Sequence, residues 1–455
     1  MTIIIKNIKL VISICLVTAL LFTVVAYSFA TTPSSSAPQK KRVILTGLFD
    51  NLGDPPRWYN FVLKPAIQEM RVKHPDLDIQ LDYRPLPYQS VHSAFLRLIA
   101  NKTSLDIIDI DPSWLGEFAQ NGLLTDITNL AESWGHLDDM YQVFLPPATY
   151  NHRLYALYTI ADIRAMWYWK DLLNQAGVDP SLLKTWSGYL SAAKKLNAVL
   201  RPLGIEGMHL VGASHAPDIE FYPYLWMLGG DILKQKNGYP AKGSYYYPAF
   251  NGTEGVRALS FIKSQIDTGI KPQKQHYWGK EFLERKFAVM LEALQNHVRD
   301  DYNVTTPEKA REFEQKVGMI PMFPIPDPSY QSATLLGGWE LGIPQSSKNK
   351  DLAWELITTM LEPKIIGPML QKYGLLPTRI SLGEGPSSIA LNSSIPYYAE
   401  LVSMIKIGKT RPNIPEFPQI SDNIKQAIDQ IYNGTREPKQ ALDEAAARSA
   451  KILGW

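Results

Sequence analysis

Hydrophobic and polar positions between residues 43 and 110 alternate between the spacing of strands and that of helices. An apolar run at 43–49 is suited to a buried strand, and apolar side chains at helical spacing follow at 61–73. Residues 77–83 then alternate with a period of two, which is typical of a strand with one buried face. A helical pattern at 91–100 leads to a further apolar run at 105–110. This order of elements predicts an α/β fold with a mixed, mostly parallel sheet flanked by helices.

The same periodicities continue toward the C-terminus. They predict helices near 190–200, 255–268, 352–361 and 421–432, and strands near 287–291 and 317–322. Pro-rich breaks at 321–328 and 412–418 punctuate this pattern. A chain of 455 residues has enough material for two or more lobes, each with its own core.

The N-terminus has the pattern of an export signal. Lys6 and Lys9 precede an apolar stretch over residues 10–30, in which Ser28 and Ala30 form a small-x-small cleavage pattern. We expect residues 1–30 to be either a signal peptide or an uncleaved anchor, because the stretch is long enough to cross a bilayer of about 30 Å. Residues 31–41 form a Ser/Pro-rich stalk. The domain is therefore expected outside the cytoplasm, whether secreted, periplasmic or tethered to the outer face of the membrane.

Charge and cysteine content exclude several kinds of partner and chemistry. The formal charge of +2 includes Lys6 and Lys9, and residues 1–30 hold no acid, so the exported part is formally neutral. A neutral body argues against a nucleic-acid partner, because phosphates usually select a basic face. The single cysteine, Cys15, lies in the leader, so the exported domain has no disulfide and no cysteine metal ligand. Ile12 and Ile14 are bulky where lipoprotein processing requires small residues, which favours a buried leader cysteine over a lipidated one.

Motifs for catalysis or cofactor binding do not occur in the chain. There is no HExxH pair, no GxSxG elbow and no GxxxxGK[ST] phosphate loop, and Gly337-Gly338 lacks the further glycine of a dinucleotide loop. We therefore expect no cofactor, no metal and no catalytic residue. The 11 Trp and 23 Tyr, together with acids in loops, suit a neutral polyol ligand, although many of these rings will fill cores.

Asparagine sequons occur five times and permit glycosylation outside the cell, although such triplets also arise by chance. They begin at Asn101, Asn251, Asn303, Asn392 and Asn433.

Residues 334–360 (TLLGGWELGIPQSSKNKDLAWELITTM) carry a Gly-Gly-Trp turn, a polar SKNK segment and an amphipathic helix. This segment resembles the signature of the sugar-type extracellular solute-binding proteins of ABC importers, the maltose-binding-like family, and is closest in motif to trehalose/maltose binders. The resemblance implies that Gly337, Gly338 and Trp339 lie at the ligand cleft, where small residues let a sugar approach the backbone and the indole stacks on it.

Residues 106–128 (DIIDIDPSWLGEFAQNGLLTDIT) resemble a strand end, a ligand loop and the following helix of the same family. The resemblance implies ligand contacts by Asp111, Ser113 and Trp114. Residues just beyond the carboxyl end of a strand also face the crevice of a doubly wound sheet. The alternative for Asp111, which precedes a proline, is a turn or a helix cap.

Residues 154–180 resemble the first crossing into the second lobe, with Asp162 in the acidic position of the family. Asp162 is interpreted as an acceptor for a sugar hydroxyl, and the alternatives are a surface carboxylate or a partner of Arg164. The aromatic run 167–169 is expected to pack inside the second lobe.

Residues 220–233 resemble the helix before the family's Gly-Gly turn, with Tyr222 expected to point into the pocket and Tyr224 or Trp226 as alternatives.

The end of the chain, residues 410–446, resembles the family's closing helices. Arg411 is interpreted either as a sugar contact or as the partner of an acid. The chain departs from the family at 291–298 (LEALQNHV), where an aromatic contact is usual, so Gln295 or Asn296 is expected to substitute for it.

The resemblance implies a two-lobed, type II periplasmic-binding-protein-like fold. Lobe 1 is expected to comprise 42–160 and 297–340, and lobe 2 to comprise 161–296 and 341–455. The function implied is capture of a sugar, a disaccharide or a short oligosaccharide, by a monomer that delivers it to the permease subunits of an ABC transporter. Two alternatives stay open: a secreted glycoside-active enzyme, since paired carboxylates and aromatic rings also make such sites, and a binding protein that serves a sensory receptor.

Overall fold

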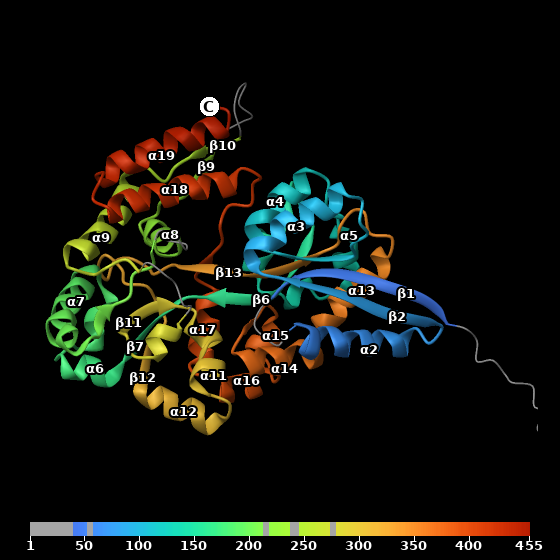
Figure 1. The fold of residues 1–455 in the computed structure, drawn as a ribbon, viewed down its shortest axis with the longest axis horizontal. Helices are drawn as coiled ribbons and strands as arrows, with labels where there is room; N and C mark the ends of the chain where they lie inside the picture. The colour runs from blue at the N-terminus through green and yellow to red at the C-terminus, as the bar shows by residue number, and fades with distance from the viewer. Residues whose placement is uncertain (1–39, 52–57, 213–217, 237–244, 274–278) are drawn as a thin grey trace, which may run out of the picture. The chain divides into compact units, whose positions relative to one another are not determined.

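The computed structural model describes residues 40–51, 58–212, 218–236, 245–273 and 279–455 (Figure 1). Residues 1–30 and most of the stalk lie outside this range, and so do the expectations for a signal peptide or an anchor. Across the described ranges, no helix has both the length and the apolar character that a membrane span requires.

The chain divides into a small and a large compact unit. Of the small unit, the described residues are 40–43 and His74–Asp78, and the backbone N–H of Lys41 donates to the carbonyl of Asp76 at 3.0 Å. The large unit comprises Ile44–Lys73 and Ile79–Trp455, and it holds every candidate site residue.

A seven-stranded sheet has the order β14-β6-β13-β3-β1-β2, with β15 beside β13. Its strands are β1 Lys41–Asp50, β2 Leu77–Leu86, β3 Ile107–Ile110, β6 Ala156–Ile163, β13 Thr334–Gly342, β14 Leu376–Pro377 and β15 Gly408–Lys409. β1 and β3 are parallel, with Leu48 opposite Ile108, and all four residues of β3 are buried. Full burial is expected for a strand in a parallel pair with helices on both faces, and Figure 1 shows α3 and α4 on one side of β1 and α2 on the other.

The helices that pack around this sheet follow its strands in the chain. They are α2 Lys64–Lys73, α3 Tyr88–Ala100, α4 Pro112–Gln120, α5 Thr128–Trp134, α13 Lys350–Met360 and α14 Pro363–Tyr373. Phe95 of α3 and Leu115 and Phe118 of α4 share one buried cluster with Ile108 and Ile110 of β3. The packing of α3 and α4 on β3 fixes the position of the loop that joins β3 to α4.

A four-stranded sheet has the order β12-β7-β11-β8. Its strands are β7 Ala165–Trp169, β8 Glu206–Met208, β11 Phe287–Glu292 and β12 Val317–Ile320. The indole N–H groups of Trp167 and Trp169 donate to the carbonyls of Glu292 and Phe282, both at 2.9 Å, and both side chains are buried. The expectation of core packing is confirmed for Trp167 and Trp169, whereas Tyr168 is half-buried.

Further helices and strands lie outside the groups described above. The helices are α6 Lys170–Gln175, α7 Trp186–Leu200, α8 Asp218–Met227, α9 Thr253–Asp267, α10 Lys280–Leu283, α11 Val298–Tyr302, α12 Pro307–Lys316, α15 Ile380–Gly383, α16 Ser388–Ser394, α17 Tyr398–Ile405, α18 Phe417–Tyr432 and α19 Pro438–Ile452, and the strands are β4 Thr149–Tyr150, β5 Arg153–Leu154, β9 Leu233–Gln235 and β10 Tyr246–Pro248. α18 and α19 pack on each other and on α9 (Figure 1).

β6 pairs with β13 in the seven-stranded sheet and continues into β7 of the four-stranded sheet. β6 and β13 are antiparallel, with Gly337 opposite Asp162 and Trp339 opposite Ile160, and a single residue, Arg164, separates β6 from β7. Gly338 has φ +128°, and a Cβ there would lie 2.1 Å from the carbonyl oxygen of Ile160, so only glycine fits this position. The close approach of these two backbones depends on that glycine.

The α/β class predicted from the sequence is confirmed, and so are the helices and strands placed by periodicity. Both sheets also contain antiparallel pairs along β6, β7 and β13, so the parallel character holds for only part of each sheet. β12, which the sequence analysis placed in lobe 1, pairs with β7 in the four-stranded sheet. The lobe boundaries as a whole stay a prediction.

Candidate functional site

Asp111 is the first residue beyond the carboxyl end of β3 and the N-cap of α4. Its Oδ1 accepts hydrogen bonds from the backbone N–H and the hydroxyl of Ser113, at 2.9 and 2.6 Å. The Asp-Pro pair produces this geometry, since proline at the first helical position lacks the N–H that would need a partner. The helix cap, one of the alternatives given for Asp111 in the sequence, is therefore present. It orients the carboxylate at the edge of the sheet.

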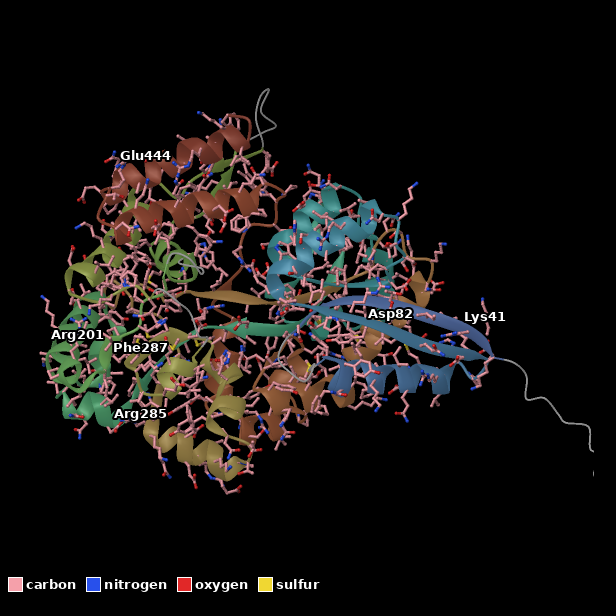
Figure 2. The ribbon with its side chains drawn as sticks, viewed as in Figure 1. Lys41, Asp82, Arg201, Arg285, Phe287 and Glu444 are labelled. Atoms are coloured by element: carbon pink, nitrogen blue, oxygen red, sulfur yellow. The ribbon has the colours of Figure 1, made fainter. Side chains whose placement is uncertain are left out.

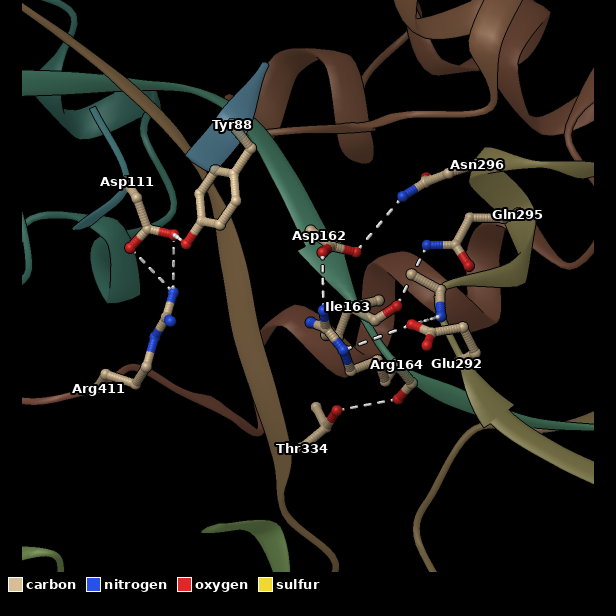
Figure 3. Close-up of polar contacts among 11 residues, drawn as sticks. Tyr88, Asp111, Asp162, Ile163, Arg164, Glu292, Gln295, Asn296, Thr334 and Arg411 are labelled. Carbon is tan, nitrogen blue, oxygen red and sulfur yellow. Dashed lines mark hydrogen bonds and ion pairs between the residues drawn. The ribbon is translucent and has the colours of Figure 1, made fainter. Parts of the chain in front are cut away.

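Arg411 reaches the same carboxylate from a distant part of the chain. Its Nη2 lies 3.1 and 3.2 Å from the two oxygens of Asp111, and the hydroxyl of Tyr88 donates to Oδ2 at 3.3 Å (Figure 3). Burial by itself raises the pKa of Asp111, but the guanidinium of Arg411 and the hydrogen bonds from Ser113 outweigh burial and lower the pKa below its ordinary value. Asp111 is thus an ionised acceptor, and Arg411 is the partner of an acid in this structure.

Three aromatic rings gather beside Asp111. Tyr88 stacks on Trp114 with 5.4 Å between ring centroids and 21° between planes, and it meets Trp339 edge-on at 5.7 Å. Trp114 and Trp339 are 6.3 Å apart. Trp114 is buried, whereas Tyr88 is 39% exposed and Trp339 is half-buried. These three residues, named here the aromatic group, present ring surface next to an ionised oxygen acceptor.

Sequence reasoning did not identify Tyr88. It begins α3, two residues after the end of β2, just as Asp111 follows β3. Its position after a strand of the same sheet is the signal that could have found it.

A second polar group surrounds Asp162 near the end of β6. Its Oδ2 lies 3.2 Å from Nη2 of Arg164, and its Oδ1 accepts from the amide of Asn296 at 3.4 Å (Figure 3). Arg164 Nε also lies 3.6 Å from Oε1 of Glu292. The interpretation of Asp162 as a partner of Arg164 is therefore correct for the geometry, and its role as a hydroxyl acceptor stays a prediction.

Gln295 and Tyr222 lie deeper than expected for ligand contacts. Gln295 is fully buried, and its amide donates to the carbonyl of Ile163 at 3.2 Å. Tyr222 is fully buried on α8, in ring contact with Trp226 and Phe417. Contact of either residue with a ligand stays a prediction.

β13 contributes residues beside both polar groups, the one around Asp111 and the one around Asp162. Trp339 belongs to the aromatic group, and Gly337, two residues earlier, is opposite Asp162. The structure therefore brings Asp111, Ser113, Trp114, Trp339 and Arg411 together. It places Gly337 and Gly338 on the same strand as Trp339, with Asp162 opposite Gly337 on β6.

Further carboxyl groups lie buried below this edge of the sheet. Asp50 ends β1, and its N–H donates to Oδ2 of Asp109 at 3.3 Å. Burial raises the pKa of Asp50 to about 7, and burial together with the charge of Asp50 raises the pKa of Asp109 well above its ordinary value. Burial likewise raises the pKa of Glu340 on β13. Of these carboxyl groups and Asp111, only Asp111 has a pKa lowered below its ordinary value, through Arg411 and Ser113.

Nothing in the described residues resembles a metal centre, because no cluster of three or more His, Cys, Asp or Glu side chains is suitably placed. A pocket of about 650 Å³ lies elsewhere, lined by residues of α6 and α12 with Trp169 and Arg285, and no candidate site residue lines it. Figure 2 labels Arg285.

An α/β fold of two sheets connected through β6, with aromatic rings and a fixed carboxylate beside the connecting strands, defines a solute-binding protein of the type II periplasmic-binding-protein fold. The family model "Bacterial extracellular solute-binding protein" matches residues 59–365, and the chain belongs to this family.

Relatives and solved structures agree with this assignment. A binding protein of Brucella abortus (strain 2308) is 25% identical over 396 residues, which cover 82% of this chain and 86% of the relative. The arabinooligosaccharide-binding protein of Bacillus subtilis (strain 168) is 24% identical over 401 residues, covering 84% and 87%. The maltose-bound structure of T. maritima MalE3 superposes with a TM-score of 0.72 at 24% identity and covers 90% of this chain and 100% of the other. At this identity the structural likeness establishes the fold alone.

Proposed function

We propose that this protein captures a neutral sugar between the aromatic group and Asp162, and that it delivers the sugar to the membrane subunits of an ABC importer. The observation that carries the proposal is the placement of Tyr88 and Trp339 beside an ionised Asp111. Aromatic rings pack on the apolar face of a pyranose, while fixed carboxylates accept its hydroxyl hydrogens.

The charges of the site favour a neutral ligand over an anionic one. The guanidinium of Arg411 is already paired with Asp111, and that of Arg164 lies between Asp162 and Glu292. Each cation therefore already faces at least one carboxylate, which weakens its attraction for a phosphate or a carboxylate. A relative that is 22% identical over 307 residues is named for sn-glycerol 3-phosphate, so the distinction matters within this family.

The same pairing supports binding without catalysis. Glycoside hydrolysis uses two carboxyl groups about 5–10 Å apart, one of which donates a proton in most mechanisms. Asp111 has a pKa below its ordinary value, which makes it a poor proton donor, and Asp162 is paired with Arg164 at 3.2 Å. We propose that the protein acts as a monomer outside the cytoplasmic membrane, with residues 1–30 as signal or anchor.

The test is calorimetric titration of the purified full chain in detergent with trehalose, maltose, maltotriose, glucose and arabinooligosaccharides. Glycerol 3-phosphate and an oligopeptide mixture serve as ligands of other classes. Binding of one sugar, with the sugar chemically unchanged afterwards, is expected. Cleaved sugar, or binding confined to the other two classes, would overturn the proposal.

The location of the site is tested with Trp339→Ala, which should weaken that binding at least about 10-fold because the stacking surface is lost. Trp354→Ala is the matched control, since Trp354 is also half-buried but contacts Trp134 on α5. Equal affinity of the two variants would place the site elsewhere.

A further inference from the structure

Arg164 occupies the connection between the two sheets. It is the single residue between β6 and β7, and its carbonyl accepts a hydrogen bond from the hydroxyl of Thr334, the first residue of β13, at 2.9 Å. Its guanidinium reaches Asp162 on β6 and Glu292 at the end of β11 (Figure 3). One side chain therefore joins a strand of the seven-stranded sheet to a strand of the four-stranded sheet.

The three charged side chains differ in their access to solvent. The side chain of Asp162 is 26% exposed, whereas those of Arg164 and Glu292 are 6% and 1% exposed. Glu292 also accepts the N–H of Ala293 at 2.9 Å, which anchors it to its own strand end. Arg164 and Glu292 thus form a buried support, and Asp162 is the member that a ligand can reach.

Two contacts orient the carboxylate of Asp162. Arg164 holds Oδ2 and Asn296 holds Oδ1. A carboxylate has about four acceptor positions, so two stay open for ligand hydroxyls after these contacts.

Gly337 leaves the carboxylate uncovered on one side. A Cβ at this position would lie 3.5 Å from Oδ2 of Asp162 and 3.6 Å from Nη1 of Arg164. Any larger side chain at residue 337 would cover both groups.

We infer that Arg164 is a positioning residue for ligand binding, which fixes the carboxylate of Asp162 as a hydroxyl acceptor and secures it to Glu292 of the other sheet. The inference rests on the proposed function. It assigns to Arg164 an effect on affinity that a purely structural ion pair would lack, because fixed ligand-contacting groups depend on the hydrogen bonds behind them.

The variants are chosen so that no buried charge is left alone. Arg164→Gln with Glu292→Gln removes the cation together with its buried acid, since removal of one partner only is strongly destabilising. Arg164→Lys keeps the charge but loses the planar fork of donors. Asp162→Asn removes the charge and one of the two acceptor oxygens.

Arg379→Lys is the matched control. Arg379 is also a buried arginine paired with a partly exposed acid, Asp139, with side-chain exposures of 8% and 23% and a distance of 2.6 Å. It lies outside both polar groups of the site, so its substitution should lower the melting temperature and leave affinity unchanged.

Affinity is measured by titration with trehalose and maltose, using whichever sugar the wild type binds, alongside the melting temperature. The double variant should bind about 10–100-fold more weakly, because the ion pair behind the Asp162 carboxylate is lost. Arg164→Lys should recover part of this loss. When Asp162→Asn is already present, adding the double substitution should weaken binding little further. The reason is that Arg164 and Asp162 act through the same carboxylate.

Wild-type affinity in the double variant, or full additivity with Asp162→Asn, would overturn the inference. If the double variant does not fold, Arg164→Lys against Arg379→Lys decides, and equal affinities would refute the role of Arg164.

If the wild type binds neither sugar, the sugar proposal fails for these ligands and the crystal structure of the double variant tests Arg164 separately. Rotation of the Asp162 carboxylate away from Asn296 is then expected. An unchanged Asp162 would overturn the inference.

Discussion

Two neighbouring glycines on β13 are expected to respond in opposite ways to the same added methyl group. A Cβ at Gly338 would lie 2.1 Å from the carbonyl oxygen of Ile160, and the residue has φ +128°. The nearest atoms to a Cβ at Gly337 are side-chain atoms of Asp162 and Arg164 at 3.5 and 3.6 Å, which is ordinary contact. The added methyl group of Gly338→Ala therefore clashes with the backbone of β6, whereas that of Gly337→Ala does not.

The expected magnitude follows from these two positions. Holding alanine at this φ costs about 1–3 kcal/mol, and displacing β6 to admit the methyl costs about 1–3 kcal/mol more. Gly338→Ala should lower the free energy of unfolding by about 2–6 kcal/mol, which at about 2.1 cal/mol/K per residue over roughly 400 residues lowers the melting temperature by about 2–7 °C. Gly337→Ala should change it by about 1 °C or less, since the smaller entropy of the unfolded alanine chain is worth about 0.4–1 kcal/mol.

The assay is thermal unfolding of both variants and the wild type, followed by far-UV circular dichroism and calorimetry at one scan rate. Gly337→Ala is the internal control for adding a methyl group to this strand. A melting temperature of Gly338→Ala within about 1 °C of wild type, or an equal fall in both variants, would refute the reasoning about the crossing.

Three further predictions concern titratable groups. Asp50 has a folded pKa of about 7 against an ordinary 3.8, so the folded state binds the proton more tightly, and the stability this contributes is lost as pH rises toward and through 7. Asp50→Asn should therefore flatten the fall in melting temperature between pH 5 and 8, and an unchanged slope would contradict the assignment. Glu220, buried on α8 with a pKa raised by burial to about 8, should behave alike over pH 5 to 9, and Glu220→Gln should remove that part of the pH dependence in chemical denaturation curves. The sign is opposite for Asp111, whose lowered pKa contributes stability that is present above pH 3.8 and lost as pH falls through the folded pKa. Arg411→Met should bring acid unfolding to a higher pH in a titration monitored by tryptophan fluorescence, and an unchanged midpoint would show that Arg411 does not stabilise the ionised carboxylate.

Local patterns in the sequence were sufficient to predict the helices and strands and to single out Asp111 as a site residue. The spacing of apolar residues predicted β1 to β3 with the helices between them, because a strand or a helix must bury one face whatever its partner is. The Asp-Pro pair after an apolar run indicated a turn or a helix cap at Asp111, and the structure has the cap. The Gly-Gly-Trp motif indicated the family, which the match over residues 59–365 shows.

Contacts between distant residues were decided by the tertiary structure. Arg411 and Asp111 are 300 positions apart, and the pairing of β13 with both β3 and β15 brings them together. The same pairing places Trp339 against Tyr88 and Trp114, which no periodicity predicts. Gln295 and Tyr222 were expected at the ligand and are fully buried, because the side that an element turns to the core depends on what packs against it. Local spacing determines which residues can share a face, but long-range strand pairing decides which faces meet.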